Sequence, residues 1–174
     1  MSWQRVFAGL LGTGSVSDSI IVWHIRLPRA LAALLVGAAL GASGAALQGL
    51  LRNPLAEPGV LGVSACASLG ATLALFFGLL NRNAFALPGA AVIGALAATY
   101  LLAAVAGRVR SMVTLILIGV GLSSFAGAVM ALLMNLSPNP FTLADMVNWM
   151  LGSVSNRSFT DIAFAAPFLI TGMV

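Results

Sequence analysis

Four long intervals without a charged residue constrain this chain more than any other feature of its sequence. They cover residues 30–51, 58–81, 83–107 and 111–144, and the last is apolar as far as about Met134. Each exceeds the roughly 20 residues that cross a hydrocarbon core about 30 Å thick as a helix. Because lipid offers no hydrogen-bond partner to an exposed backbone, each interval is expected to be helical. The alternation typical of a membrane β-barrel is absent.

The composition also indicates a membrane protein. Hydrophobic residues make up 60% of the 174 residues, charged residues 7%, and the mean hydropathy is +1.07. A soluble domain is typically about 25% charged. The predicted fold class is therefore an all-α membrane protein, a polytopic bundle of transmembrane helices. Its expected spans are about 30–51, 59–80, 85–107 and 111–134.

The two ends of the chain differ from this pattern. Residues 1–25 mix glycine, serine and apolar residues, and are interpreted as an N-terminal loop with room for a short helix. After the turn-forming cluster at 135–140, residues 141–153 have helical spacing, which predicts a short interfacial helix. Trp149 suits the headgroup level there. The apolar run 162–174 reaches only about 20 Å as a helix and is predicted to be an incomplete span, as in a truncated protein or a fragment.

The polar residues exclude several classes of function. All eight basic residues are arginine, spread singly or in pairs, which favours membrane boundaries over nucleic-acid binding. Cys66 is the single cysteine and lies inside an apolar run, so no disulfide framework is expected. His24 has no other ligand type nearby, so neither a metal site nor a cofactor is predicted. No Walker-type glycine loop occurs, so the chain is not expected to hydrolyse ATP.

Small residues recur every fourth position in two of the intervals, and such stripes let helix backbones approach closely in lipid. The predicted helix-packing positions are Ala33, Gly37, Gly41, Ala45 and Gly49 in the first interval and Gly119, Ser123, Gly127 and Ala131 in the last. A weaker stripe comprises Ala90, Gly94 and Ala98.

The loop at residues 52–59 has two interpretations. Asn53-Pro54 favours a turn, Pro58 fits the first position of a helix, and Arg52 and Glu57 each complement a helix dipole. Local chemistry alone therefore explains the octapeptide as a tight helical hairpin. The alternative is that this loop is a functional motif.

A longer comparison favours the functional motif. Residues 26–29 (RLPR), 36–49 (VGAALGASGAALQG) and 52–64 (RNPLAEPGVLGVS) together resemble the FecCD-type permease family. Residues 115–120 and 149–153 follow in the family's order, and the resemblance covers nearly all of residues 20–174. These permeases are the membrane subunits of binding-protein-dependent ABC importers for iron–siderophores, haem and vitamin B12.

The resemblance implies a roughly ten-helix permease of which residues 26–174 would be a part, from the second helix to the start of the sixth. It implies a second permease subunit, two ATPase subunits, a periplasmic or lipid-anchored binding protein, and the inner membrane. The transported chelate stays open. A secondary transporter or channel, or a truncated permease without function, are the alternatives; the lack of ionisable residues in the spans favours a pathway driven from outside the membrane domain.

The resemblance also implies site residues. The translocation gate would comprise Asn53, Leu55, Ser111 and Met112, with the helix that follows Ser111 lining the pathway. Arg26 and Arg29 would lie on the periplasmic side, where they contact either a binding protein's acidic surface or lipid headgroups. The implied cytoplasmic loops carry three arginines and the opposite side five, against the positive-inside rule. The family topology is nevertheless preferred.

Overall fold

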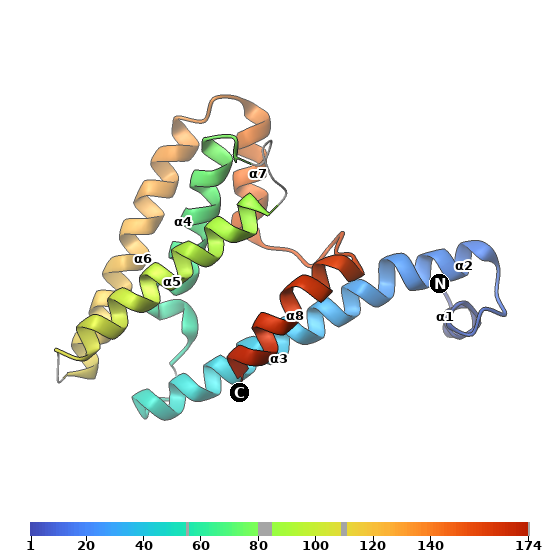
Figure 1. The fold of residues 1–174 in the computed structure, drawn as a ribbon, viewed down its shortest axis with the longest axis horizontal. Helices are drawn as coiled ribbons and strands as arrows, with labels where there is room; N and C mark the ends of the chain where they lie inside the picture. The colour runs from blue at the N-terminus through green and yellow to red at the C-terminus, as the bar shows by residue number, and fades with distance from the viewer. Residues whose placement is uncertain (55, 80–84, 109–110, 174) are drawn as a thin grey trace. The chain divides into compact units, whose positions relative to one another are not determined.

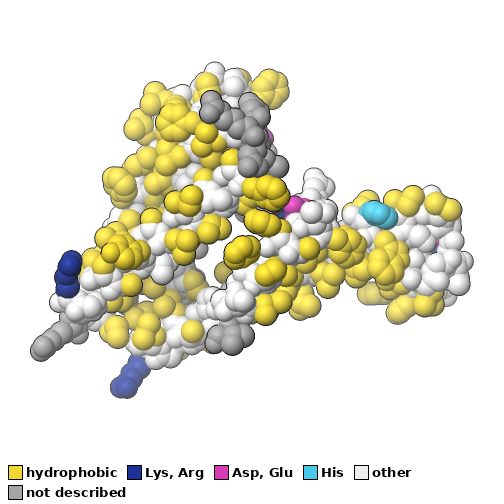
Figure 2. Space-filling view, viewed as in Figure 1, with side chains coloured by type: hydrophobic (Ala, Val, Ile, Leu, Met, Phe, Trp, Pro, Cys, Tyr) yellow, Lys and Arg dark blue, Asp and Glu magenta, His cyan; other side chains and the backbone are white. Residues whose placement is uncertain are grey.

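The computed structural model describes residues 1–54, 56–79, 85–108 and 111–173, and every regular element among them is helical. The chain forms two compact units, one of residues 1–45 with 154–174 and one of residues 46–153. Figure 1 shows the course of the helices. Hydrophobic side chains cover much of the visible face in Figure 2, as expected of a surface that meets lipid.

The first unit begins with a short lateral helix and a long one. Helix α1 (Trp3–Leu10) leads into α2 (Val16–Ile20), the π-helix η1 (Ile21–Arg26) and α3 (Leu27–Leu51), of which residues 46–51 belong to the second unit. Together α2, η1 and α3 make one apolar helix of 36 residues, Val16–Leu51. Helix α8 (Phe159–Met173) completes the elements of this unit.

The structure corrects the expected loop at residues 1–25. Ser15 caps α2 by accepting a hydrogen bond from the Asp18 N–H at 3.2 Å, so a residue taken for a loop residue starts a helix. Pro28 would normally disrupt an α-helix, because its ring clashes with the carbonyl four residues back. The π-helix just before it changes that register, and the Leu27 N–H donates to the Val22 carbonyl instead. The helix therefore continues through Pro28.

The second unit is built around a short helix. It contains the 3-10 helix η2 (Pro58–Leu61) and the helices α4 (Val63–Phe76), α5 (Ala86–Ala106), α6 (Met112–Asn135) and α7 (Pro140–Leu151). Helix α4 contacts η2 and the other three helices. It also supplies much of the core, where the buried residues include Ala71, Thr72, Ala74 and Leu75.

Three helices of the described residues are long and apolar enough to cross a membrane: Val16–Leu51, Ala86–Ala106 and Met112–Asn135. The span expected at 59–80 is different, because η2 and the left-handed Gly62 use its first residues. What remains is α4, with 14 residues and a length of about 21 Å. Helix α7 forms near the predicted 141–153, and its Met146 is completely buried.

Candidate functional site

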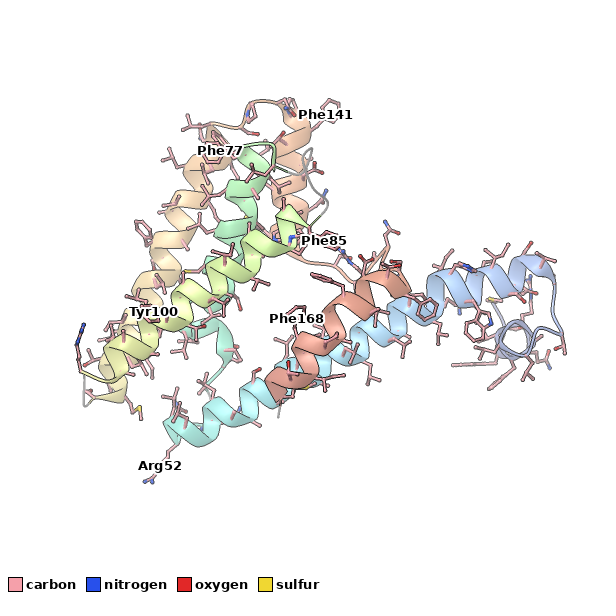
Figure 3. The ribbon with its side chains drawn as sticks, in the orientation of Figure 1. Arg52, Phe77, Phe85, Tyr100, Phe141 and Phe168 are labelled. Carbon is pink, nitrogen blue, oxygen red and sulfur yellow. The ribbon has the colours of Figure 1, made fainter. Side chains whose placement is uncertain are left out.

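The loop that carries Asn53 starts from a well-defined helix end. Arg52 adopts a left-handed φ of 47°, the Asn53 N–H donates to the Gln48 carbonyl at 3.2 Å, and the Arg52 N–H donates to the Gly49 carbonyl at 3.4 Å. This pair of bonds is a Schellman motif, which satisfies carbonyls that a helix end leaves free. The Ala56 N–H then donates to the Asn53 carbonyl at 3.1 Å. Figure 3 shows the Arg52 side chain extending past the end of α3.

The loop continues into η2, which packs directly on α6. Gly62 ends η2 with φ 78°, and a Cβ there would lie 2.8 Å from the Gly119 carbonyl oxygen and 3.1 Å from the Ser123 nitrogen. A Cβ on Gly119 would lie 2.7 Å from the Leu61 Cα. The two backbones therefore touch without intervening side chains. We call Gly62, Gly119 and Ser123 the glycine seam.

Ser123 contributes a polar atom to this seam. Its Oγ is buried and has no hydrogen-bond partner among the described residues. A Cβ on Gly62 would lie 3.1 Å from the Ser123 Oγ, so the seam has no room for a larger residue at position 62. Gly119 and Ser123, predicted from spacing to pack, thus pack against the 3-10 segment.

Ser111 and Met112 lie at the start of the same helix, about two turns before Gly119. Ser111 has extended backbone angles as the N-cap of α6, and its carbonyl accepts from the Leu115 N–H at 3.3 Å. Met112 is 48% exposed. Leu55, the fourth predicted gate residue, lies outside the described residues. The glycine seam thus places η2, into which the Asn53 loop continues, against the helix that begins after Ser111.

Only some of the remaining small residues contact a neighbouring helix. A Cβ on Gly94 would run into the Cys66 carbonyl, and one on Gly70 would run into the Ala90 carbonyl, so α4 and α5 cross at backbone contact. Gly94 belongs to the weaker predicted stripe. Gly70 was missed in the sequence, although Gly62, Cys66, Gly70, Ala74 and Gly78 recur every fourth position. At the other predicted glycines a Cβ would meet no described atom within 4 Å, and Ala45 is exposed; these glycines are Gly37, Gly41, Gly49 and Gly127.

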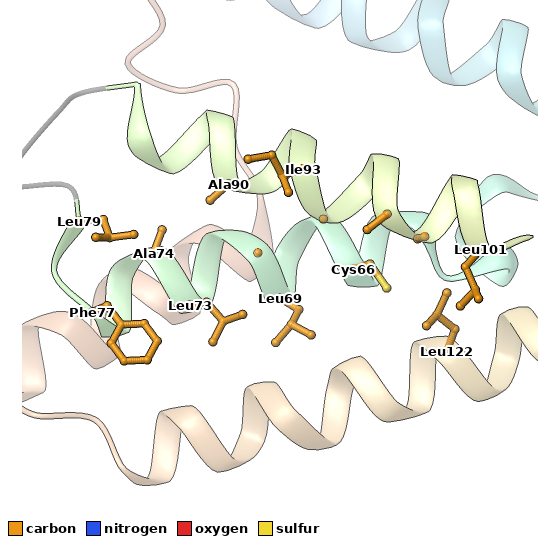
Figure 4. A pocket seen from close by; sticks show the side chains of 14 residues that line it. Cys66, Leu69, Leu73, Ala74, Phe77, Leu79, Ala90, Ile93, Leu101 and Leu122 are labelled. Carbon is orange, nitrogen blue, oxygen red and sulfur yellow. The ribbon is translucent and has the colours of Figure 1, made fainter.

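A cavity of about 450 Å³ lies along the crossing of α4 and α5. It is lined by side chains such as Leu69, Leu73, Ile93 and Leu101, with Leu122 from α6 (Figure 4). Its apolar lining suits hydrocarbon and lacks the polar groups that would orient a hydrophilic ligand. Sequence reasoning missed this cavity, because only the paired glycines of α4 and α5 signal that the helices meet there.

The helices of this unit offer few charged or metal-binding side chains. Helices α4, α5 and α6 contain no Asp, Glu, Lys, Arg or His. Within the described parts of the chain, no group of three or more His, Cys, Asp or Glu residues could hold a metal ion. In the first unit, Arg26 and Arg29 are exposed, on η1 and in the first turn of α3.

Comparison with known proteins decides the family. The model of the FecCD transport family matches residues 1–174, the whole chain. The chain belongs to the FecCD transport family. This FecCD chain is 41% identical over 99% of its length to the uncharacterized ABC transporter permease protein YvrB of Bacillus subtilis. It is 44% identical over 79% of its length to the vitamin B12 import system permease protein BtuC of Citrobacter koseri.

A solved structure gives the same result for the fold. The FecCD chain matches an ABC transporter of the metal-chelate type in an inward-facing conformation, with a TM-score of 0.82 and 29% identity over 96% of the chain. It covers 56% of that solved chain, 50% of YvrB and 42% of BtuC. The FecCD chain thus spans about half the length of the relatives it matches, and it is a multi-pass membrane protein of a permease family.

Proposed function

We propose that this chain is part of the membrane-embedded permease subunit of a binding-protein-dependent ABC importer in the inner (plasma) membrane. The family match over the whole chain supports this function. The importer's cargo is a metal chelate: an iron–siderophore, haem or cobalamin. A relative named for vitamin B12 import and a solved relative of metal-chelate type support that class of cargo.

The gate of this importer comprises Asn53 and Leu55 from one loop and Ser111 and Met112 from the start of α6. The observation that supports this proposal is the glycine seam, since it holds η2, into which the Asn53 loop continues, against α6 by backbone contact. A displacement of α6 would therefore move the loop with it. Asn53 is held by backbone hydrogen bonds on both sides, which fixes the point at which its side chain leaves the loop.

Driving force comes from partner subunits. Helices α4, α5 and α6 contain no ionisable side chain apart from Cys66 and Tyr100, so they offer no carboxylate or lysine for ion coupling. Two ATPase subunits would supply the energy, a second permease subunit would complete the pathway, and a periplasmic or lipid-anchored binding protein would deliver the chelate. Arg26 and Arg29 are exposed and are the candidate contacts for that protein.

Uptake measurements test the gate. We expect Ser111→Trp to slow uptake of radiolabelled cobalamin or iron–siderophore by cells producing the protein, because an indole at the start of α6 narrows the pathway. Val92→Trp is the control, since Val92 on α5 is 56% exposed and lies outside the proposed gate. Equal uptake by the two variants, both present in the membrane, would remove Ser111 from the pathway.

Purification tests the assembly. The tagged chain, extracted from its native membrane, should carry an ATPase subunit and a second permease subunit with it. If neither is recovered after chemical cross-linking, the chain does not assemble into an importer, and the alternative of a transport-deficient fragment is correct.

A further inference from the structure

The hydroxyl of Ser123 lacks a bond that hydroxyls in five apolar helices form. In each of these helices a Ser or Thr hydroxyl donates to the carbonyl oxygen four residues earlier, at 2.7–2.9 Å. These bonds join Ser43 to Ala39, Thr72 to Ser68, Thr99 to Ala95, Ser124 to Val120 and Thr171 to Pro167. Such a bond gives a hydroxyl a partner where lipid offers none. The buried Ser123 Oγ makes no hydrogen bond with any described residue.

The approach of η2 explains why Ser123 lacks this bond. The carbonyl four residues before Ser123 belongs to Gly119, and a Cβ on Gly62 would lie 2.8 Å from its oxygen. The same Cβ would lie 3.1 Å from the Ser123 Oγ. Gly62 therefore stands beside both groups that the bond would join. Ser124, one residue further on, is exposed and forms the corresponding bond to the Val120 carbonyl at 2.9 Å.

The unpaired hydroxyl weakens the closed seam. A buried hydroxyl without a partner costs free energy that a paired one does not. The Ser123 Oγ is covered by the chain itself, so a partner from outside the chain reaches it only when η2 moves away. Once Gly62 has left, the hydroxyl can bond to the Gly119 carbonyl, because a helix always places that oxygen within its reach. The penalty therefore belongs to the closed seam alone.

We propose that Ser123 makes the glycine seam a releasable joint between η2 and α6. While the seam is closed, Ser123 has no partner and η2 follows α6. When η2 withdraws, the hydroxyl bonds to the Gly119 carbonyl, which stabilises the open seam, and the two elements move separately. Ser123 is thus a positioning residue that sets the balance between two arrangements of η2, the segment into which the Asn53 loop continues.

Hydrogen–deuterium exchange measures this balance in the full chain, held in nanodiscs with any subunits that accompany it. Peptides across 58–62 report on η2, where the Gly62 N–H donates to the Gly59 carbonyl at 3.2 Å and exchanges once η2 has left α6. We expect Ser123→Ala to slow this exchange roughly ten-fold, because alanine removes the penalty from the closed seam and the bond from the open one. Ser124→Ala, the same change one residue further on, is the control and should leave the exchange unchanged.

Three results would contradict the proposal. Equal exchange in the wild type and in Ser123→Ala would mean that the hydroxyl already has a partner in the closed seam, such as a bound water. Faster exchange in Ser123→Ala would mean that the hydroxyl holds the seam together. An equal slowing in Ser124→Ala would assign the effect to the helix propensity of alanine. The measurement involves no cargo, so each of these results leaves the proposed function standing.

Discussion

At positions 62, 94 and 119 a hydrogen atom stands where any other residue would place a carbon against a neighbouring backbone. The sequence alone shows glycines at many positions, and spacing cannot separate those at a contact from those facing lipid. Gly119 and Gly127 belong to the same predicted stripe, yet only Gly119 touches a neighbour. The difference arises from η2, whose approach to α6 depends on the left-handed turn at Gly62.

Alanine substitutions at Gly119 and Gly127 measure how much the glycine seam contributes to stability. We expect Gly119→Ala to lower the free energy of unfolding by about 1–3 kcal/mol, because its Cβ meets the Leu61 Cα at 2.7 Å. Gly127→Ala, with nothing within 4 Å, should be neutral or stabilise the helix by up to about 1 kcal/mol. Thermal unfolding of both variants in the same detergent is the measurement. Equal stability would mean that the seam opens at little cost.

Asp161 predicts a pH dependence at the start of α8. Its Oδ2 accepts the Ser158 N–H and the Ser158 hydroxyl, both at 2.9 Å, and Ser158 Oγ accepts the Asp161 N–H. The hydrogen bond from the Ser158 backbone, followed by that from its side chain, lowers the pKa of Asp161. Because the folded pKa is below the unfolded value, this capping stabilises α8 above about pH 4 and is lost as the pH falls through the folded pKa.

Hydrogen exchange can follow this loss. The first amides of α8 should exchange faster, relative to the intrinsic rate, as the pH is lowered below about 4. Asp161→Asn should abolish the pH dependence while keeping the side-chain shape. A persistent pH dependence in that variant would assign the effect to another group.

Among the elements, the crossing of α4 and α5 offers a natural reporter. Cys66 is the single cysteine of the chain, and its carbonyl lies where a Cβ on Gly94 would stand. We expect Gly94→Ala to push the two helices apart and to speed the reaction of Cys66 with a membrane-permeant maleimide several-fold. Gly89→Ala on the same helix, with open space around it, is the control. Equal rates in both variants would show that the crossing adjusts without opening.

The sequence predicted elements better where one physical term dominates. The charge-free intervals led to helices near α5, α6 and the C-terminal part of the long helix, because hydrocarbon demands internal hydrogen bonding. Prediction from the sequence failed where local backbone geometry competes with hydropathy. The π-helix that accommodates Pro28 and the turn at Gly62 that shortens α4 both depend on single residues whose effect is tertiary. The candidate gate stays a prediction from the resemblance, whereas the seam that holds η2 on α6 is visible only in three dimensions.

For the whole molecule, orientation in the membrane is the open prediction from the sequence. With Cys66 replaced by alanine, a cysteine at Asn53 should react with an impermeant thiol reagent only from the cytoplasmic side. A cysteine at the exposed Thr13, which precedes the long helix in the chain, should react only from outside. The reverse pattern would invert the topology and bring the arginine count into agreement with the positive-inside rule.

Helix α4 has a consequence for the bilayer around it. At about 21 Å it is shorter than the hydrocarbon layer, so at least one of its ends stops within the thickness that lipid tails occupy. Non-helical backbone at such depth persists only where protein or water replaces lipid. On the η2 side, α6 shields part of that backbone. We expect water to meet the groups that α6 leaves open, and a measurement of solvent accessibility along Pro58–Leu61 tests this without any cargo being present.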